Sequence, residues 1–526
     1  NTPGIPGVLA KRQFDTIDDL LLKLDASLCK ELINEVLPKL SILDPACGSG
    51  AFLVAAMKTL INIYSAITGK VEFLGDPQLT QWLQKIHTDH PSLAYYIKKQ
   101  IITNNLFGVD IMPEAAEIAK LRLFLTLVAS VEKVEQLEPL PNIDFNLLTG
   151  NSLIGLLRVN EADFDNEYRQ GSLFQKSYRQ LVDEKKRHLD IYRFSTTYSE
   201  DLQNLRDAIE AQRLEAYKSL NELLLNEFSR LDIKFEQSVW DEKKEKEGRS
   251  VKRGVRLPDI EALAPFHWGY EFDEVMNFHG GFDAIITNPP WDIFKPNAKE
   301  FFQEFSDLVT KKKMSIFDFE SEMAYLVENK EIRGAWFQYK NNFSYQSQYF
   351  RNSETFINQI SIIDGKKTGS DINLYKLFVE QCFNLLRADG LCGMVIPSGI
   401  HTDQGTLQLR KLLFEKTQIC GLFGFENRKA IFEGVHKSFK FDIITYQKGR
   451  QTQEFPAAFM RHEVNELASF PIQRGINIPV GLIKRLSPDS WSVMEFKEEI
   501  DIQIAEKMLH FPLLGEKVDG KIYLKL

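Results

Sequence analysis

The sequence has few cysteines and no pairing pattern among them. Its 526 residues include five cysteines, and no two of these form a C-x-x-C pair. A disulfide scaffold and a zinc module both need clustered cysteines, so neither is indicated. Cys47 lies in a glycine-containing loop, and we expect Cys29, Cys382, Cys392 and Cys420 to be small core residues.

Membrane and secretion signals are also missing. No apolar run reaches transmembrane length, and no charged-then-apolar leader opens the sequence, so we expect a cytoplasmic protein. Positive charge is not in excess either, because the formal net charge is −9 at pH 7. That balance argues against a protein that coats nucleic acid uniformly, but it permits a local basic cleft facing phosphates.

What remains is an ordinary globular composition, with 44% hydrophobic and 26% charged residues. The length predicts about two to four domains. The sequence begins at Asn1-Thr2 without a methionine. We therefore interpret it as a piece of a longer protein.

The most informative stretch is an apolar run that stops at two prolines. Phe282 to Thr287 is rich in β-formers and is followed by Asn288-Pro289-Pro290-Trp291, which predicts a buried strand and a rigid turn. Because prolines donate no N–H, the carbonyls of Asn288 and Pro289 are left without ladder partners. With the Asn288 side-chain oxygen, the turn can present converging acceptors to an exocyclic amino group, and Trp291 can stack on a base. An ordinary strand end with a half-buried Trp would have the same sequence.

A second motif lies far upstream. Ser41 to Leu53 reads Ser-Ile-Leu-Asp-Pro-Ala-Cys-Gly-Ser-Gly-Ala-Phe-Leu, an order of strand, acidic residue, glycine loop and helix that suits a nucleotide-type ligand. The spacing differs from the G-x-G-x-x-G of dinucleotide sites. Asp44, ahead of the glycines, suits a ligand with a positive charge.

Together the two motifs resemble those of the amino-group DNA methyltransferases that use S-adenosylmethionine. Motif I before motif IV matches the gamma class, and the long insertions are similar to those of large, type IIG-like restriction-modification proteins. The resemblance implies a Rossmann-like, seven-stranded α/β sheet with one antiparallel strand, Lys440 to Gln447, and large helical insertions. The positions that it assigns to the cofactor are Asp44, Pro45, Ala46, Cys47, Gly48, Gly50, Phe52, Asp110, Ile111, Asn151 and Leu153.

Some of these positions follow later strands. Leu106 to Ile111 is a short predicted strand ending in a carboxylate, and Asp110 there can accept hydrogen bonds from both ribose hydroxyls. Ile111 would lie against the cofactor adenine. Alternatively, Asp110 caps the helix that begins at Pro113. Asn151, after the third strand, is the candidate for the adenine amino group of the cofactor.

The stretch Phe423 to Thr445 predicts strand, basic loop and strand, and it resembles motif VIII of the same enzymes. In the family an aromatic residue here holds the extruded base opposite the Asn-Pro-Pro-aromatic turn. Phe432 is the first candidate and Phe439 the second, although both could be hairpin core residues. We expect His436 to be a loop or phosphate-contacting residue, since this chemistry needs no strong base.

Four segments are predicted along the chain. They are an N-terminal helix with the cofactor-binding half of the methyltransferase domain (1–157), a helical insertion (158–270), the catalytic half (271–450) and a connector toward a target-recognition domain (451–526).

The insertion is expected to hold two long antiparallel helices, Tyr178 to Arg193 and Asp201 to Ile233, and a mixed-charge linker over Asp241 to Arg256. It is either an edge insertion or a clamp on DNA or a partner. Lys295 to Phe350 interleaves aromatics with cations and suits a surface beside unstacked nucleic acid. Its run Lys311 to Lys313 could equally form a solvated helix end.

The resemblance implies transfer of a methyl group from S-adenosylmethionine to N6 of a flipped adenine in double-stranded DNA, without a metal or a covalent intermediate. It also implies nuclease and target-recognition domains, in the same or a partner chain, and a role in restriction-modification or phage defence. The alternatives are cytosine-N4 methylation, methylation of RNA or protein amino groups, and a silent DNA- or SAM-binding subunit. The implied catalytic positions are Asn288, Pro289, Pro290 and Trp291, with Trp291, Phe432 and Phe439 against the base.

Overall fold

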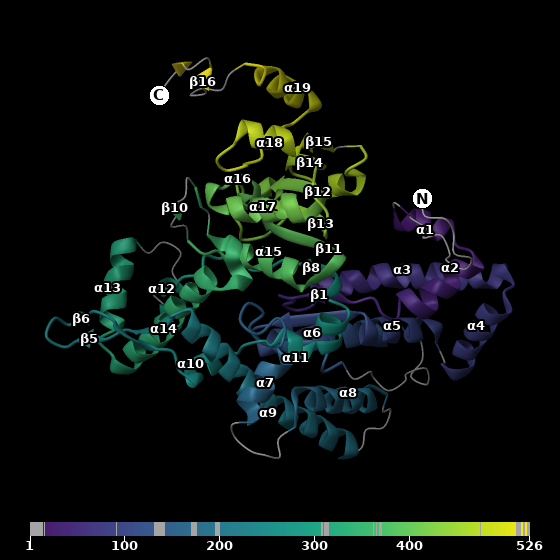
Figure 1. The fold of residues 1–526 in the computed structure, drawn as a ribbon, viewed down its shortest axis with the longest axis horizontal. Helices are drawn as coiled ribbons and strands as arrows, with labels where there is room; N and C mark the ends of the chain where they lie inside the picture. The colour runs from purple at the N-terminus through teal and green to yellow at the C-terminus, as the bar shows by residue number, and fades with distance from the viewer. Residues whose placement is uncertain are drawn as a thin grey trace.

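The computed structural model describes residues 14, 16–90, 92–130, 143–169, 176–194, 200–306, 309, 315–360, 362–363, 366–367, 371–473, 475–511, 517–518 and 521–522. Within these residues a mixed sheet of nine strands forms the centre of the chain, and helices lie on both of its faces (Figure 1). The expected α/β class is therefore confirmed.

The strand order of this sheet is β15-β14-β12-β13-β11-β8-β1-β2-β3. Neighbours from β3 to β11 run parallel, whereas β13 runs antiparallel to both β11 and β12. The antiparallel strand expected at Lys440 to Gln447 is therefore confirmed. The bounds are β1 (Ile42–Asp44), β2 (Leu106–Asp110), β3 (Leu147–Thr149), β8 (Phe282–Thr287), β11 (Leu386–Pro397), β12 (Thr417–Glu426), β13 (Lys440–Lys448), β14 (Glu454–Arg461) and β15 (Ile476–Pro479).

The sheet is larger than the seven strands expected. The additional strands are β14, which pairs parallel with β12, and β15, which pairs antiparallel with β14. Both come from the segment beyond residue 450 that was expected to be only a connector. Pro456 lies inside β14, and an internal proline argues against a strand when only the sequence is read. Pairing beside β12 nevertheless buries Phe455 and Ala457 in the main core.

Two layers of helices cover the sheet. Successive strand residues point to opposite faces, and in β1 Ile42 belongs to one buried cluster and Leu43 to the other. The helices on the face of Ile42 are α2 (Ala26–Glu31), α3 (Ala51–Leu74), α4 (Pro77–Asp89), α5 (Leu93–Asn104) and α6 (Pro113–Val128). Those on the face of Leu43 are α9 (Glu200–Arg230), α10 (Leu257–Glu261), α11 (Trp268–Glu271), α14 (Lys330–Asn352), α15 (Leu374–Leu385) and α17 (Leu407–Lys416).

The expected N-terminal helix is broken into separate pieces. Thr16 caps α1 (Ile17–Leu22) and Asp25 caps α2, because each side chain accepts a backbone N–H of the helix that follows it. A π-helical turn, Leu32–Val36, continues α2.

Helix α3 is the helix expected after the glycine loop. It runs to Leu74, where Gly75 adopts a left-handed conformation and ends it. By length and composition α3 could cross a membrane, which corrects the expectation that no apolar run reaches that length. A core helix passes the same test, and the buried side chains of α3, such as Leu53 and Met57, join the cluster on the sheet.

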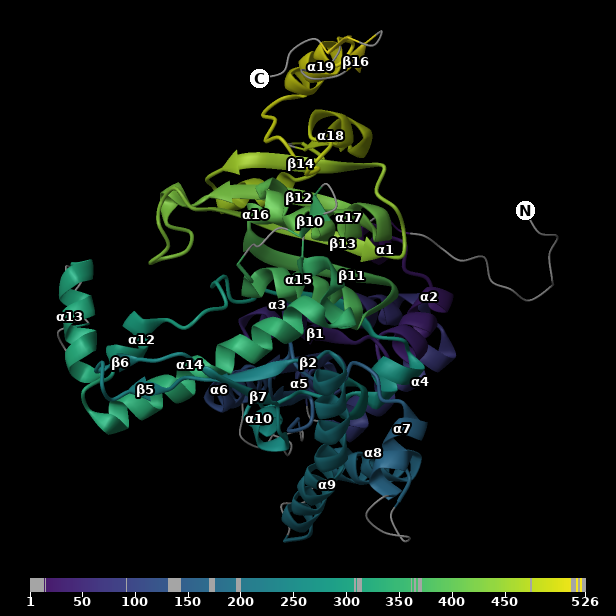
Figure 2. The ribbon, with the colours of Figure 1, turned by 60° about the vertical axis from the view of Figure 1, so that its left-hand side comes forward.

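The insertion holds the two long helices that were predicted. Helix α8 (Tyr178–Phe194) lies antiparallel to α9, with Gln212 Nε2 donating to the Leu181 carbonyl at 2.7 Å, and Figure 2 shows both helices at one end of the molecule. The expected linker over Asp241 to Arg256 is instead a β-ribbon. Its charges face outward, while Arg253 stacks 4.0 Å from the centroid of the Phe235 ring. The ribbon strands are β4 (Lys234–Gln237), β5 (Trp240–Asp241), β6 (Lys246–Glu247) and β7 (Val251–Gly254).

The remaining elements are short. The α-helices are α7 (Glu161–Arg169), α12 (Ala298–Phe302), α13 (Ile316–Leu326), α16 (Gly399–Thr402), α18 (Val480–Leu486) and α19 (Glu499–Met508). The strands are β9 (Ile362–Ile363), β10 (Lys366–Lys367), β16 (Lys517–Val518) and β17 (Lys521–Ile522), with a π-helical turn at Glu274–Phe278 and 3₁₀ turns at Glu354–Gln359, Gln404–Thr406, Asn427–Lys429 and Val464–Ser469.

Candidate active site

The glycine loop lies where β1 ends and α3 begins. Gly48 and Gly50 have φ angles of 49° and 77°, which L side chains rarely adopt. A Cβ on Gly50 would also lie 3.0 Å from the Cβ of Ala119 on α6. The cap position of α3 is Gly50, which has no side chain to bond the first N–H groups of the helix, so they can meet a ligand or water.

Asp44 closes β1 and is 1% exposed. Its Oδ1 accepts the Ala46 N–H at 3.2 Å. Burial raises the pKa of Asp44 to about 7, although its hydrogen bonds oppose the rise. A positive charge close to this carboxyl would favour its ionised form. This agrees with the expectation that Asp44 suits a ligand with a positive charge.

Asp110 connects the end of β2 to the glycine loop. Its Oδ2 accepts the Gly48 N–H at 2.8 Å, and its Oδ1 accepts the Met112 N–H at 2.9 Å. The residue at the cap position of α6 is Met112, and no side chain caps that helix. The alternative that Asp110 is the helix cap is therefore wrong. Its role toward a ribose stays a prediction.

A cavity of about 520 Å³ lies at this carboxyl edge of the sheet, within the size range of small-molecule sites. Six expected cofactor positions line it, together with Pro290 of the Asn-Pro-Pro-Trp turn. The six are Pro45, Ala46, Asp110, Ile111, Asn151 and Leu153. The other five, Asp44, Cys47, Gly48, Gly50 and Phe52, are not among the lining residues.

One wall of the cavity was not foreseen as a cofactor wall. Helix α14 supplies Tyr339, Asn342, Phe343, Gln346 and Phe350 to the lining. The aromatic content of this stretch was visible in the sequence, but it was interpreted as a nucleic-acid surface. The run Lys311 to Lys313, which was part of that predicted nucleic-acid surface, lies outside the described residues.

Sequence reasoning also missed a buried hydrogen-bond network behind the cavity. The Ser152 hydroxyl donates to the Pro45 carbonyl at 2.5 Å. The Ser152 carbonyl accepts Trp268 Nε1–H at 3.1 Å and Gln381 Nε2–H at 2.7 Å. The network joins the Asn151 turn to the glycine loop. Isolated Ser, Trp and Gln residues carry no sequence signal that would reveal it.

Asn288 follows β8, the neighbour of β1 in the sheet. Because β1 and β8 are parallel, with Leu43 opposite Ile285, Asn288 and Asp44 lie at the same edge. The Asn288 Oδ1 atom is buried and has no hydrogen-bond partner among the described residues. Buried acceptors without partners are costly. This atom therefore marks a place where a donor from outside the chain would be stabilising.

Trp291 lies in a cluster of phenyl rings. The Phe439 ring is nearly parallel to it, at 9° and 5.5 Å between centroids, whereas Phe432 is edge-on at 76° and 5.2 Å. Phe441 is stacked at 29° and 5.8 Å. The ring parallel to Trp291 is thus Phe439, the second candidate, and Phe432 packs against its edge. His436 lies between Phe432 and Phe439 in the exposed loop that follows β12, where its Nδ1 is 2.8 Å from Ser438 Oγ.

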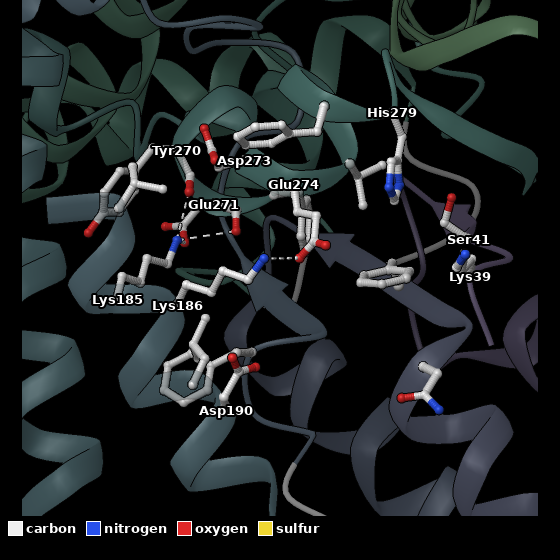
Figure 3. Close-up of a pocket in the computed structure, with 18 of the residues that line it drawn as sticks. Lys39, Ser41, Lys185, Lys186, Asp190, Tyr270, Glu271, Asp273, Glu274 and His279 are labelled. Carbon is white, nitrogen blue, oxygen red and sulfur yellow. Dashed lines mark hydrogen bonds and ion pairs between the residues drawn. The ribbon is translucent and has the colours of Figure 1, made fainter. Parts of the chain in front are cut away.

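A second cavity, of about 300 Å³, lies at the opposite, amino edge of the sheet. Figure 3 shows its charged lining, where Lys185 contacts Glu271 and Lys186 contacts Glu274. Ser41, just before β1, is also in the lining. Nothing in the sequence interpretation pointed to this cavity.

A family model described as Eco57I restriction-modification methylase matches residues 104–363 and 344–432, more than half of the chain. The chain belongs to this family. A further model, the DNA-methyltransferase domain of MmeI, matches residues 24–145 of the Eco57I-family chain. The resemblance to type IIG-like restriction-modification DNA methyltransferases is therefore confirmed.

A protein of Methanocaldococcus jannaschii, named as a type II restriction enzyme and methyltransferase, is 30% identical to this Eco57I-family chain over 339 residues. The match covers 56% of the chain and 27% of that relative, so the chain spans about a quarter of its length. Among solved structures, a DrdV–DNA complex is similar over 90% of the chain and 30% of its own, at 12% identity and a TM-score of 0.35. MmeI in complex with DNA is similar over 87% and 35%, at 13% identity and a TM-score of 0.33.

Proposed function

We propose that this Eco57I-family chain transfers a methyl group from S-adenosylmethionine to the N6 amino group of adenine in DNA, within a restriction-modification system. The observation that carries the proposal is the buried, unpartnered Asn288 Oδ1, on the turn whose Pro290 lines the cavity. An exocyclic amino group is the donor that such an acceptor lacks.

The residues at the carboxyl edge fit the cofactor. S-adenosylmethionine, when bound, supplies a methyl group on a positively charged sulfonium. Asp110 and Asn151 would hold its polar groups, while Ile111 and Leu153 give the cavity apolar contacts. The buried Asp44 carboxyl adds the negative charge that a cationic ligand needs.

The chain's own chemistry is positioning. Asn288 Oδ1 and the Pro289 carbonyl would accept both N–H groups of the target amino nitrogen, which draws its lone pair out of conjugation with the ring. Trp291 stacks on the extruded base, a contact worth about 1–3 kcal/mol in single-strand binders. That stacking offsets part of the cost of taking the base out of the duplex, a few kcal/mol. No strong base is required, because the amino proton leaves after the nitrogen has become cationic.

The test is methyl transfer from labelled S-adenosylmethionine to mixed-sequence DNA by the longest native chain, followed by digestion to nucleosides. N6-methyladenine is the expected product. N4-methylcytosine would support the cytosine alternative, although Asn288 stands where that group more often has Ser or Asp. Cofactor binding without a DNA product would mean that a target-recognition domain is missing from the chain tested or that the substrate is an RNA or protein amino group.

The full-length protein is a separate proposal. The Methanocaldococcus relative is named as both a restriction enzyme and a methyltransferase and is longer than the stretch matched here. We propose that nuclease and target-recognition domains act with this chain, in the same or a partner polypeptide. Mapping methylated positions in genomic DNA of a host that expresses the full-length protein would give the recognition sequence.

A further inference from the structure

We infer that Asn427 is the positioning residue that holds the aromatic loop over Trp291. The inference rests on the proposed function, since the aromatic rings matter as contacts to an extruded base. The loop is residues 428–439, between β12 and β13, and it contains both Phe432 and Phe439. Asn427 lies at its start and is 0% exposed.

The Asn427 side chain closes the loop from inside. Its Nδ2 donates to the carbonyls of Phe432 at 2.9 Å and Val435 at 3.0 Å. Its Oδ1 accepts the Phe432 N–H at 2.9 Å. Both ends of the amide are therefore engaged within the loop, and an aspartate of the same shape could not make the two donations.

The Asn427 backbone fixes the other end of the loop. Its N–H donates to the Phe439 carbonyl at 2.9 Å, and the Phe439 N–H donates to the His436 carbonyl at 2.9 Å. One buried residue thus contacts the backbone on both sides of the loop. Because these bonds tie Phe432, Val435 and Phe439 to a single residue, we expect the loop to move as one body.

The position of Phe439 determines whether a base can reach the face of Trp291. Two rings with a base between them need about 7 Å between their planes, twice a van der Waals contact of ~3.5 Å. The nearly parallel Trp291 and Phe439 rings have centroids only 5.5 Å apart. Phe439 therefore covers this face of Trp291, and a base can enter between the rings only when the Phe439 ring moves away.

The experiment follows the Trp291 ring directly, without substrate. The full chain has six tryptophans, and labelling with 5-fluorotryptophan gives each a ¹⁹F resonance. The resonance that disappears in Trp291→Phe belongs to Trp291. In Asn427→Asp and Asn427→Ala this resonance should move toward its position in Phe439→Ala, because the stacked ring leaves. Methyl transfer to DNA should fall about tenfold with loss of base stacking, while affinity for S-adenosylmethionine stays unchanged.

The matched control is Asn105→Ala. Asn105 is also 0% exposed, and its Nδ2 donates to the carbonyls of Leu37 and Leu40 at 2.6 and 2.7 Å, far from the loop. The Asn105→Ala variant should have a lower free energy of unfolding and leave the Trp291 resonance at its wild-type position. If folded Asn427→Asp and Asn427→Ala proteins keep the wild-type resonance, the inference is overturned. Absence of methyl transfer by the longest native protein, with its target-recognition domain present, would overturn the proposed function, while the resonance result would still decide the role of Asn427.

Discussion

The two edges of the central sheet differ in how one polar group at each edge is satisfied, Asn288 at the carboxyl edge and Glu271 at the amino edge. At the carboxyl edge, Asn288 Oδ1 is buried without a partner and the Asp44 carboxyl is buried without a cation beside it in the described part of the chain. At the amino edge, Glu271 accepts bonds from Arg213, Tyr217 and Lys185. The comparison teaches that charge in a cavity does not by itself indicate a reactive site. The Asn288 acceptor indicates a site because it lies on the motif turn; buried groups without partners also occur elsewhere among the described residues, such as the Tyr270 hydroxyl at the amino edge.

The largest expected effect comes from removing the Glu271 charge at the amino edge. Burial would raise the pKa of Glu271, but Arg213 and Lys185 outweigh it and lower the pKa to about 2. In Glu271→Gln the buried Lys185 and the partly buried Arg213 lose their counter-charge, so the free energy of unfolding at pH 7 should fall by about 3–5 kcal/mol. Urea denaturation measures it. The exposed neighbour, Glu274→Gln, should change stability by no more than about 0.5 kcal/mol. Equal losses in the two variants would contradict the comparison.

Next comes the unpartnered acceptor at the carboxyl edge. Asn288→Ala should lower kcat for methyl transfer by roughly 100- to 1,000-fold, as when one positioned polar group is removed from an active site. Stability should be unchanged or slightly higher, because a buried unpaired group is removed. Single-turnover transfer and calorimetry of cofactor binding separate the two effects. Asn297→Ala, which removes a surface cap of α12, serves as the control. Normal transfer by Asn288→Ala would end its proposed role.

A histidine near the carboxyl edge tests whether that edge also holds a buried charge with its counter-charge beside it. Burial would lower the pKa of His401, but Asp442 at 2.5 Å and Glu495 at 3.7 Å outweigh it and raise the pKa to about 9. The folded pKa lies above the unfolded value, so this stabilisation, on the order of 3 kcal/mol, is complete below about pH 6.5 and is lost as pH rises through 9. Unfolding free energies from pH 6 to 10 measure it. His401→Gln should flatten that part of the profile, and an unchanged slope would refute the assignment.

The smallest effect concerns the link between β2 and the glycine loop. Asp110→Ala removes the acceptor for the Gly48 and Met112 N–H groups and the proposed ribose contact. Affinity for S-adenosylmethionine should fall about tenfold, which corresponds to loss of one charge-assisted hydrogen bond. Calorimetry measures the dissociation constant. Asp283→Ala, at the amino edge where Asp283 pairs with Arg387, should leave the affinity unchanged. An unaltered constant in Asp110→Ala would limit that residue to a structural role.

Local patterns predicted much of the fold. The antiparallel direction of Lys440–Lys448 was implied by the family resemblance. From local pattern alone, the apolar run Phe282 to Thr287 is a strand and the glycine loop precedes a helix. These features depend on neighbouring residues: β-formers, prolines that end a strand, and glycines that adopt positive φ. The errors came where the pattern was weak. An internal proline, Pro456, argues against the strand β14, whose segment was expected to be a connector. The dense charges of Asp241 to Arg256 predicted a linker where the structure has a β-ribbon.

The site was less accessible to prediction. Six expected positions line the cavity, but the α14 wall and the Ser152 network depend on contacts between segments more than a hundred residues apart. Residue spacing within one segment contains no information about such contacts.

The sequence by itself determined the motif chemistry: an acceptor-presenting turn at Asn288, a glycine loop after Asp44 and an aromatic loop before the last expected strand. Only the tertiary structure decided which ring lies parallel to Trp291 and which charges are paired. The physical reason is how far apart in the sequence the interacting residues lie. Backbone torsions and the alternation of burial follow from adjacent residues, whereas the contact of Phe439 with Trp291 is set by a loop closed on the buried Asn427. The satisfaction of Glu271 likewise requires cations from two helices of the insertion.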